Sequence, residues 1–149
     1  MSEAHISLTE RQSLPISKAI NAGLRAAMAA DERVVLMGED IGPLGGVFRV
    51  TDGLQRDFGS ARVIDTPLAE AGIVGSAIGL AMAGFRPVVE IQFDGFVFPA
   101  FDQITTQLAK MTNRLEGAAS LPVVIRIPYG GHIGAIEHHQ ESPETYFAH

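Results

Sequence analysis

A single glutamate begins the most apolar helix that the sequence predicts, and its carboxylate is the leading candidate for proton chemistry. Glu70 follows Asp65-Thr66-Pro67 and precedes a run of mostly glycine and alanine that ends near Gly84. A carboxylate in a first helical turn often only complements the helix dipole. If Thr66 is the cap, however, the reciprocal capping position is Ala69 rather than Glu70. The helix is almost free of other polar groups, so this carboxylate lies beside a dry region and needs a partner.

A histidine-rich stretch, residues 129–142, is the second place where proton chemistry is predicted. It contains His132, His138 and His139 together with Glu137 and Glu141. Adjacent histidines cannot easily direct both imidazoles at one metal ion, and no His-x-x-x-His pair is present. An imidazole that titrates near neutral pH suits proton transfer or charge stabilisation better. An inert, solvated loop remains the alternative.

Phenylalanines crowd the segment around the predicted turn Asp94-Gly95, at positions Phe93, Phe96, Phe98 and Phe101. Most of these rings are expected in the core. An aromatic ring at the carboxyl end of a strand can instead stack on a planar heterocycle.

Glycines inside the predicted helix do not form a nucleotide-binding motif. Gly72, Gly75 and Gly79 lie within the helix rather than in the turn before it, so they fail the dinucleotide fingerprint and predict close helix packing instead. The sequence also lacks a Gly-x-Ser-x-Gly hydrolase motif and a Walker motif.

Helices and strands alternate along the chain and must position these residues. An apolar residue recurs every four positions from Ile16 to Met28, which predicts an amphipathic helix with Ser13 as its cap. Further helices are predicted at 52–58, 70–84 and 99–113 and from Pro143, and apolar strands at 34–37, 63–64, 87–93 and 121–127. The alternation predicts an α/β fold with a parallel sheet and helices on both faces. Ligands of such folds bind beyond the carboxyl ends of the strands.

The composition predicts one globular domain and excludes several classes of function. The chain has 149 residues, of which 46% are hydrophobic, and it carries a net charge of -6 with no cluster of lysine or arginine. Binding to nucleic acid is therefore not expected. There is no cysteine, no targeting signal, and no apolar run long enough to span a bilayer. A cytoplasmic protein without a membrane partner is expected.

Five segments resemble, in order and spacing, the β subunits of 2-oxo acid dehydrogenases. They are VVLMGED at 34–40, GGVFRVT at 45–51, DTPLAE at 65–70, EIQF at 90–93 and FPAFDQI at 98–104. The branched-chain type is the most similar, chiefly through residues 92–104, and the pyruvate type is next. The resemblance implies a tail at 1–13 and a transketolase-like pyrimidine-binding domain at 14–149. That domain is expected to be incomplete at its C-terminus and to lack the C-terminal domain of the family.

The resemblance also implies a site for thiamine diphosphate. Glu70 matches the glutamate that contacts N1′ of the aminopyrimidine, where a hydrogen bond favours the imino tautomer that takes the proton from C2 of the thiazolium. Phe96 matches the aromatic residue that stacks on the pyrimidine ring. Leu68 and Gln92 match residues that line the same pocket.

Two further sites are implied by the resemblance alone. His139, three residues before Ser142-Pro143-Glu144, matches the histidine that assists reductive acylation of the lipoyl group. A register shift of one residue leaves His138 as the alternative. Main-chain oxygens that bind potassium in related members correspond to Leu121, Val123 and Val124.

The implied parent enzyme is an α2β2 heterotetramer bound to a lipoyl acyltransferase core. It decarboxylates 2-oxo acids oxidatively on thiamine diphosphate and acylates lipoamide reductively. The α subunit holds Mg²⁺ and the diphosphate through a Gly-Asp-Gly motif that this chain lacks, so this chain alone is expected to be inactive. Two alternatives remain: a transketolase or deoxyxylulose phosphate synthase type of enzyme, and a non-catalytic assembly subunit.

Overall fold

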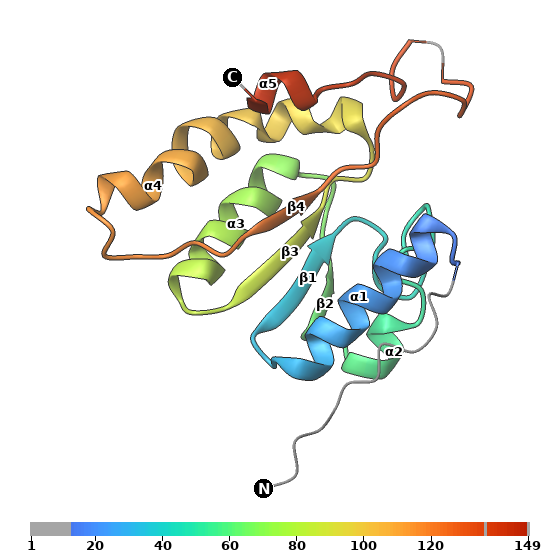
Figure 1. Ribbon diagram of the computed structural model, residues 1–149, viewed down its shortest axis with the longest axis horizontal. Helices are drawn as coiled ribbons and strands as arrows, with labels where there is room; N and C mark the ends of the chain where they lie inside the picture. Colours follow the sequence, from blue (N-terminus) through green and yellow to red (C-terminus); the bar gives the residue numbers. More distant parts are fainter. Residues whose placement is uncertain (1–12, 136, 149) are drawn as a thin grey trace, which may run out of the picture.

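The computed structural model describes residues 13–135 and 137–148, which form a four-stranded parallel sheet with helices on both faces (Figure 1). The strands are β1 (Val34–Gly38), β2 (Val63–Asp65), β3 (Arg86–Glu90) and β4 (Val124–Arg126). Their order in the sheet is β2-β1-β3-β4. The predicted α/β fold is thus confirmed. Residues 1–12 of the predicted tail, and His149 at the predicted domain end, lie outside the described residues.

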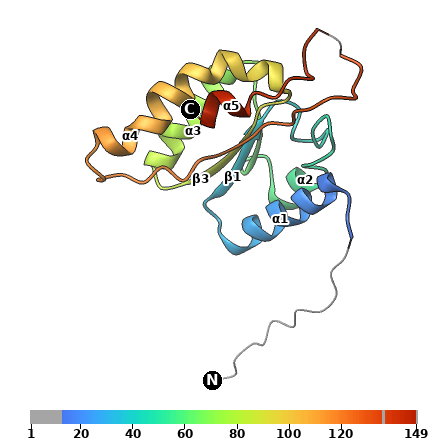
Figure 2. The same cartoon turned by 45° about the horizontal axis from the view of Figure 1, so that its top comes forward.

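Two helical layers cover the sheet (Figures 1 and 2). One face carries α1 (Ile16–Ala30) and α2 (Leu54–Phe58), and the other carries α3 (Glu70–Met82) and the long helical segment that follows β3. This segment consists of η1 (Asp94–Ala100), η2 (Gln103–Leu108) and α4 (Ala109–Arg114), and the short α5 (Glu144–Ala148) packs its aromatic rings against it. No helix in the described part of the chain is long and apolar enough to cross a membrane.

The core explains why these segments become strands and helices. All five residues of β1 are buried, as expected of a parallel strand covered on both faces. Met28, Leu36 and Leu54 fill the core on the α1 side, and Ile73 and Val89 belong to the core on the α3 side. The predicted glycine-rich helix buries only one face in this chain. Its other face exposes small residues, among them Ala71, Gly72, Ser76 and Gly79.

Local hydrogen bonds account for the departures from the predicted elements. The first helix is capped by Pro15 rather than Ser13, with no side-chain cap. The predicted helix at 99–113 is divided into 3-10, π and α turns. The hydroxyls of Thr105 and Thr106 donate to the carbonyls four residues before them, at 2.9 and 2.7 Å, and such bonds compete with regular helical geometry.

Arg62 ties together the amino ends of the strands. Its guanidinium donates hydrogen bonds of 2.9 Å to the carbonyl oxygens of Met28, Asp31 and Val34. The same group lies over the ring of Phe58, 5.4 Å from the ring centre. One cation thereby binds three carbonyl oxygens, of which that of Asp31 also accepts a hydrogen bond of 3.2 Å from the Val34 N–H.

Asp31 forms an exposed ion-pair network at the same end of the sheet. Its carboxylate pairs with Arg33 at 2.8 Å and with Arg86 at 3.3 Å. Hydrogen bonds from the side chain and backbone of Arg33 lower the pKa of Asp31 to about 2. The amino ends of β1 and β3 are therefore linked through one carboxylate.

Candidate functional site

The predicted site residues follow the carboxyl ends of the strands. β1 ends at Gly38, β2 at Asp65 and β3 at Glu90, and the parallel register places these three residues side by side. Parallel sheets commonly bind ligands at this edge.

Glu70 is the first residue of α3, and its side chain is only 6% exposed. The residue before it, Ala69, caps the helix without a side-chain hydrogen bond. Glu39 directly follows β1 and is also 6% exposed. Burial raises the pKa of Glu39, and the adjacent carboxylates of Glu70 and Asp40 and a hydrogen bond to Glu70 raise it further. The buried carboxyl groups of Glu39 and Glu70 are thus adjacent at the carboxyl edge of the sheet.

Sequence reasoning missed Glu39, although a signal was present. Glu39 directly follows a strand that is apolar throughout, so its side chain had to emerge at the same edge as Glu70. The loop after it is held in place by the Gly42 N–H, which donates to Asp65 at 2.6 Å, and by the Thr51 hydroxyl, which donates to the Ile41 carbonyl at 2.7 Å.

Gln92 contacts the segment after β1, Phe96 packs against the core beside α3, and Leu68 is exposed to solvent. The Gln92 side-chain amide donates to the Asp40 carboxylate at 2.9 Å, which brings the segment after β3 beside the end of β1. Phe96 packs against the core cluster that contains Val74, one helical turn after Glu70. Leu68 is 72% exposed and is thus available to a partner chain. The roles of all three in cofactor binding stay predictions.

His139 is buried in an aromatic cluster, and His138 is exposed. The His139 ring stacks on Phe93 at 4.4 Å and meets Phe96 edge-on at 4.7 Å. Its backbone adopts a left-handed conformation with φ of 66°, which is uncommon for a residue other than glycine. The structure therefore fixes His139 and leaves His138 at the surface, with the two rings 4.0 Å apart.

The residues predicted to bind potassium lie at the start of β4. The strand begins at Val124, and the carbonyl of Leu121 accepts a hydrogen bond of 2.8 Å from the Val123 N–H. Within 13–135 and 137–148, no three histidine, aspartate or glutamate side chains are grouped to hold a metal ion. The main-chain potassium site stays a prediction.

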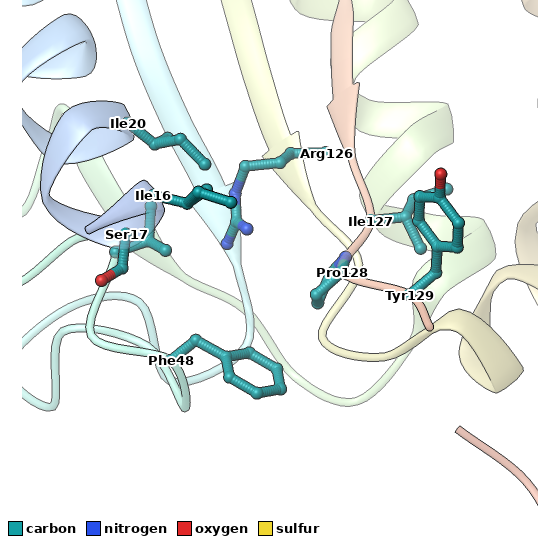
Figure 3. Close-up of a pocket in the computed structure, with 9 residues that line it drawn as sticks. Ile16, Ser17, Ile20, Phe48, Arg126, Ile127, Pro128 and Tyr129 are labelled. Atoms are coloured by element: carbon teal, nitrogen blue, oxygen red, sulfur yellow. The ribbon is translucent and has the colours of Figure 1, made fainter. Parts of the chain in front are cut away.

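A cavity of about 430 Å³ adjoins the aromatic cluster, between α1 and the chain that follows β4 (Figure 3). Arg126, which forms a largely buried ion pair with Glu90, extends its guanidinium towards Ile16 of α1 in this view. The remaining walls are mostly apolar, and none of the predicted site residues lines them. Phe48, on one wall, meets the ring of Phe93 edge-on at 5.5 Å.

Residues 12–149 match the family described as "Transketolase, pyrimidine binding domain". The chain is 77% identical over 138 residues to the pyruvate dehydrogenase E1 component subunit beta of Leifsonia xyli, covering 93% of this chain and 41% of the relative. It is 57% identical over 138 residues to the 3-methyl-2-oxobutanoate dehydrogenase subunit beta of Mycobacterium tuberculosis, covering 93% and 40%. A pyruvate dehydrogenase E1 component subunit beta of Acholeplasma laidlawii is 51% identical over 134 residues, covering 90% and 41%.

This chain therefore spans about 41% of the length of the curated relatives that it matches. The family match nevertheless covers every described residue, including all four strands of the parallel sheet and the buried carboxyl pair at its carboxyl edge. On these grounds, the chain belongs to the transketolase pyrimidine-binding domain family.

Proposed function

We propose that this chain is the pyrimidine-binding part of a β subunit of a 2-oxo acid dehydrogenase. With an α subunit, the whole protein would decarboxylate a 2-oxo acid oxidatively on thiamine diphosphate and acylate lipoamide reductively. The observation that carries the proposal is the buried carboxylate of Glu70, which faces the acid Glu39 at the ligand-binding edge of the sheet. The relatives named as β subunits of two such dehydrogenases support it.

The residues present fit the pyrimidine half of the cofactor. A ring nitrogen needs a hydrogen-bonding group in a dry place, and Glu70 and Glu39 offer two buried carboxyl groups with one raised pKa. Two adjacent buried carboxyls resist ionising together, which is the direction in which burial and Glu70 shift the pKa of Glu39. Phe96 offers an aromatic face for the ring, and Leu68 and Gln92 complete the proposed lining. When bound, thiamine diphosphate supplies a carbon nucleophile and an electron sink for decarboxylation.

The remaining parts of the proposed site are divided between partner chains and this chain. An α subunit would hold Mg²⁺ and the diphosphate, and a lipoyl acyltransferase core would receive the acyl group. His139 would act on the acyl-transfer side, and the main-chain oxygens of Leu121, Val123 and Val124 would bind potassium. The α2β2 assembly, the domain bounds and a cytoplasmic location belong to the same proposal.

Similarity to relatives favours each of two substrates. The segment 92–104 resembles the branched-chain type, and a relative that is 57% identical is named for 3-methyl-2-oxobutanoate. A relative that is 77% identical is named for pyruvate. An assay of the full-length β chain, co-expressed with its α subunit, on both acids in competition assigns the substrate from the ratio of the two kcat/KM values.

The carboxyl pair is tested by replacing Glu70 in that same assembly. Glu70→Gln should lower kcat by about 10²- to 10⁴-fold, the range usual for the loss of a general acid or base. Glu32→Gln, at an exposed glutamate near the amino end of the sheet, is the matched control and should leave kcat unchanged. Full activity of Glu70→Gln, or a wild-type assembly that does not bind thiamine diphosphate in calorimetry, would contradict the proposal. The second result would favour an assembly subunit.

A transketolase-type enzyme is distinguished by its substrates. Such an enzyme would act on sugar phosphates without an acyltransferase and would carry both halves of the site in one chain. Turnover of a ketose phosphate by the co-expressed assembly, with none of either 2-oxo acid, would replace the dehydrogenase assignment.

A further inference from the structure

Asp94 is a buried carboxylate with no assigned role, and it joins two distant parts of the chain. It begins η1, four residues after the last residue of β3, and is 1% exposed. One carboxylate oxygen accepts a hydrogen bond of 2.7 Å from the backbone N–H of Glu141, 47 residues further along the chain. A charge this deeply buried requires partners. Asp94 is therefore a tether between the sheet edge and the histidine-rich stretch 129–142.

The second oxygen of Asp94 faces His139. Asp94 Oδ1 lies 3.7 Å from His139 Nδ1, and neither atom has a hydrogen-bond partner. Hydrogen bonds in sites without ligand are often long and tighten when the ligand binds. A small movement would therefore join these two atoms and satisfy both.

Gly95 leaves the space that the imidazole occupies. A Cβ atom at this position would lie 3.1 Å from His139 Nδ1 and 3.4 Å from its Cε1. The ring is thus confined by the backbone of Gly95, by the face of Phe93 and by the edge of Phe96. With Nδ1 directed at Asp94, the opposite ring nitrogen, Nε2, is left to act on a reacting group.

We propose that Asp94 is a positioning residue that docks the loop through Glu141 and holds the Nδ1–H of His139, so that Nε2 faces the acyl-transfer side. The inference rests on the proposed function, in which His139 serves reductive acylation. A carboxylate that binds one imidazole nitrogen fixes the tautomer and the orientation of the other. Asp94 itself touches neither substrate nor cofactor.

The first test separates the two half-reactions in the assembly of full-length β chain and α subunit. Decarboxylation is followed by reduction of ferricyanide, and acyl transfer by reductive acylation of a lipoyl domain. Asp94→Asn retains an oxygen for the Glu141 N–H but cannot accept from Nδ1–H through its amide nitrogen. It should slow acyl transfer about 10- to 100-fold, the usual loss for an outer partner of a functional histidine, and change ferricyanide reduction less than twofold.

A second variant and a matched control keep this test decisive. Gly95→Ala would push a methyl group against the imidazole and should show the same selective loss. His132→Gln, at an exposed histidine of the same stretch, should leave both half-reactions unchanged. Acyl transfer at the wild-type rate in both Asp94→Asn and Gly95→Ala would overturn the inference, as would equal losses in both half-reactions.

Hydrogen exchange of the Glu141 amide tests the tether by a readout that does not depend on enzyme activity. Protection of this amide in the wild-type assembly, and its loss in Asp94→Ala, would support the tether. Exchange at the same rate in both proteins would overturn it. If the wild-type assembly proves inactive on 2-oxo acids while the amide is protected, the proposed function fails and the docking role of Asp94 stands.

Discussion

The two ends of the parallel sheet differ in how their buried polar groups are satisfied. At the amino end, Arg62 donates to three carbonyl oxygens and Asp31 binds two arginines. At the carboxyl end lie all the buried side-chain atoms without a hydrogen-bond partner that the described residues contain. They belong to Glu39, Thr66, Glu90, Asp94, Arg126 and His139.

Unsatisfied buried polar groups are rare in native proteins because they lower stability, so their collection at one edge needs a reason. Glu90 and Arg126 of this set form an ion pair, and the Nδ1 atom of His139 lies 3.7 Å from an oxygen of Asp94. The remaining groups lie at the edge where parallel sheets commonly bind ligands. The comparison teaches that polar groups at the amino end contribute stability, while the carboxyl end keeps unsatisfied polar groups at the edge to which the proposed function assigns cofactor binding.

The largest stability effect is expected at the amino end, for Arg62→Ala. The change removes a cation that satisfies three carbonyls and should lower the free energy of unfolding by about 2–3 kcal/mol, as for hydrogen bonds to a charged donor. Urea denaturation of the chain measures it. Arg114→Ala, at an exposed residue of α4, is the control and should cost less than about 0.5 kcal/mol. Equal stabilities of the two variants would remove the basis for the comparison.

A smaller effect of opposite sign is expected at the carboxyl end, for Glu39→Gln. Because burial and Glu70 raise the pKa of Glu39 in the folded chain, its stabilising contribution is complete below the ordinary value of 4.5 and is lost as pH rises through the raised pKa. The amide does not ionise, so the variant should become more stable than the wild type as pH rises towards neutrality. Thermal unfolding across that range measures the difference. If the stabilities of the two proteins changed in parallel with pH, ionisation of Glu39 would not lower the free energy of unfolding.

The smallest effect is expected for Asp31→Asn, because Asp31 is an exposed group whose ion pairs are screened by salt. Its pKa is lowered from 3.8 to about 2, so the carboxylate stabilises the folded chain above 3.8 and loses this contribution as pH falls through 2. Wild type and variant should therefore differ slightly at pH 5 and converge only as the pH falls below the pKa of about 2. A difference that grows on acidification would reverse the sign of the argument.

Much of the fold could be predicted because the signals are local. The apolar runs of β1 and β3 and the helical spacing of α1 each specify an element within a few residues of sequence. The position of Glu70 at the start of a helix beyond a strand followed from the same alternation. The predicted boundaries of β4 were wrong, because the strand has three residues rather than the seven of the apolar run 121–127.

The pairings at the site could not be predicted because they are long-range. Glu39 meets Glu70 only once β1 and β2 are placed side by side, and Asp94 meets Glu141 across 47 residues. In the sequence, Asp94-Gly95 has the composition of a plain turn. No periodicity distinguishes an aspartate that ends a strand in solvent from one that a returning loop will bury.

The left-handed backbone at residue 139 has a consequence for the evolution of this chain. Glycine or asparagine would adopt the φ of 66° with less steric cost than histidine does. A population selected for thermal resistance alone should thus drift towards those residues at this position. If histidine persisted at this position, selection would be acting on its chemical role rather than on thermal stability.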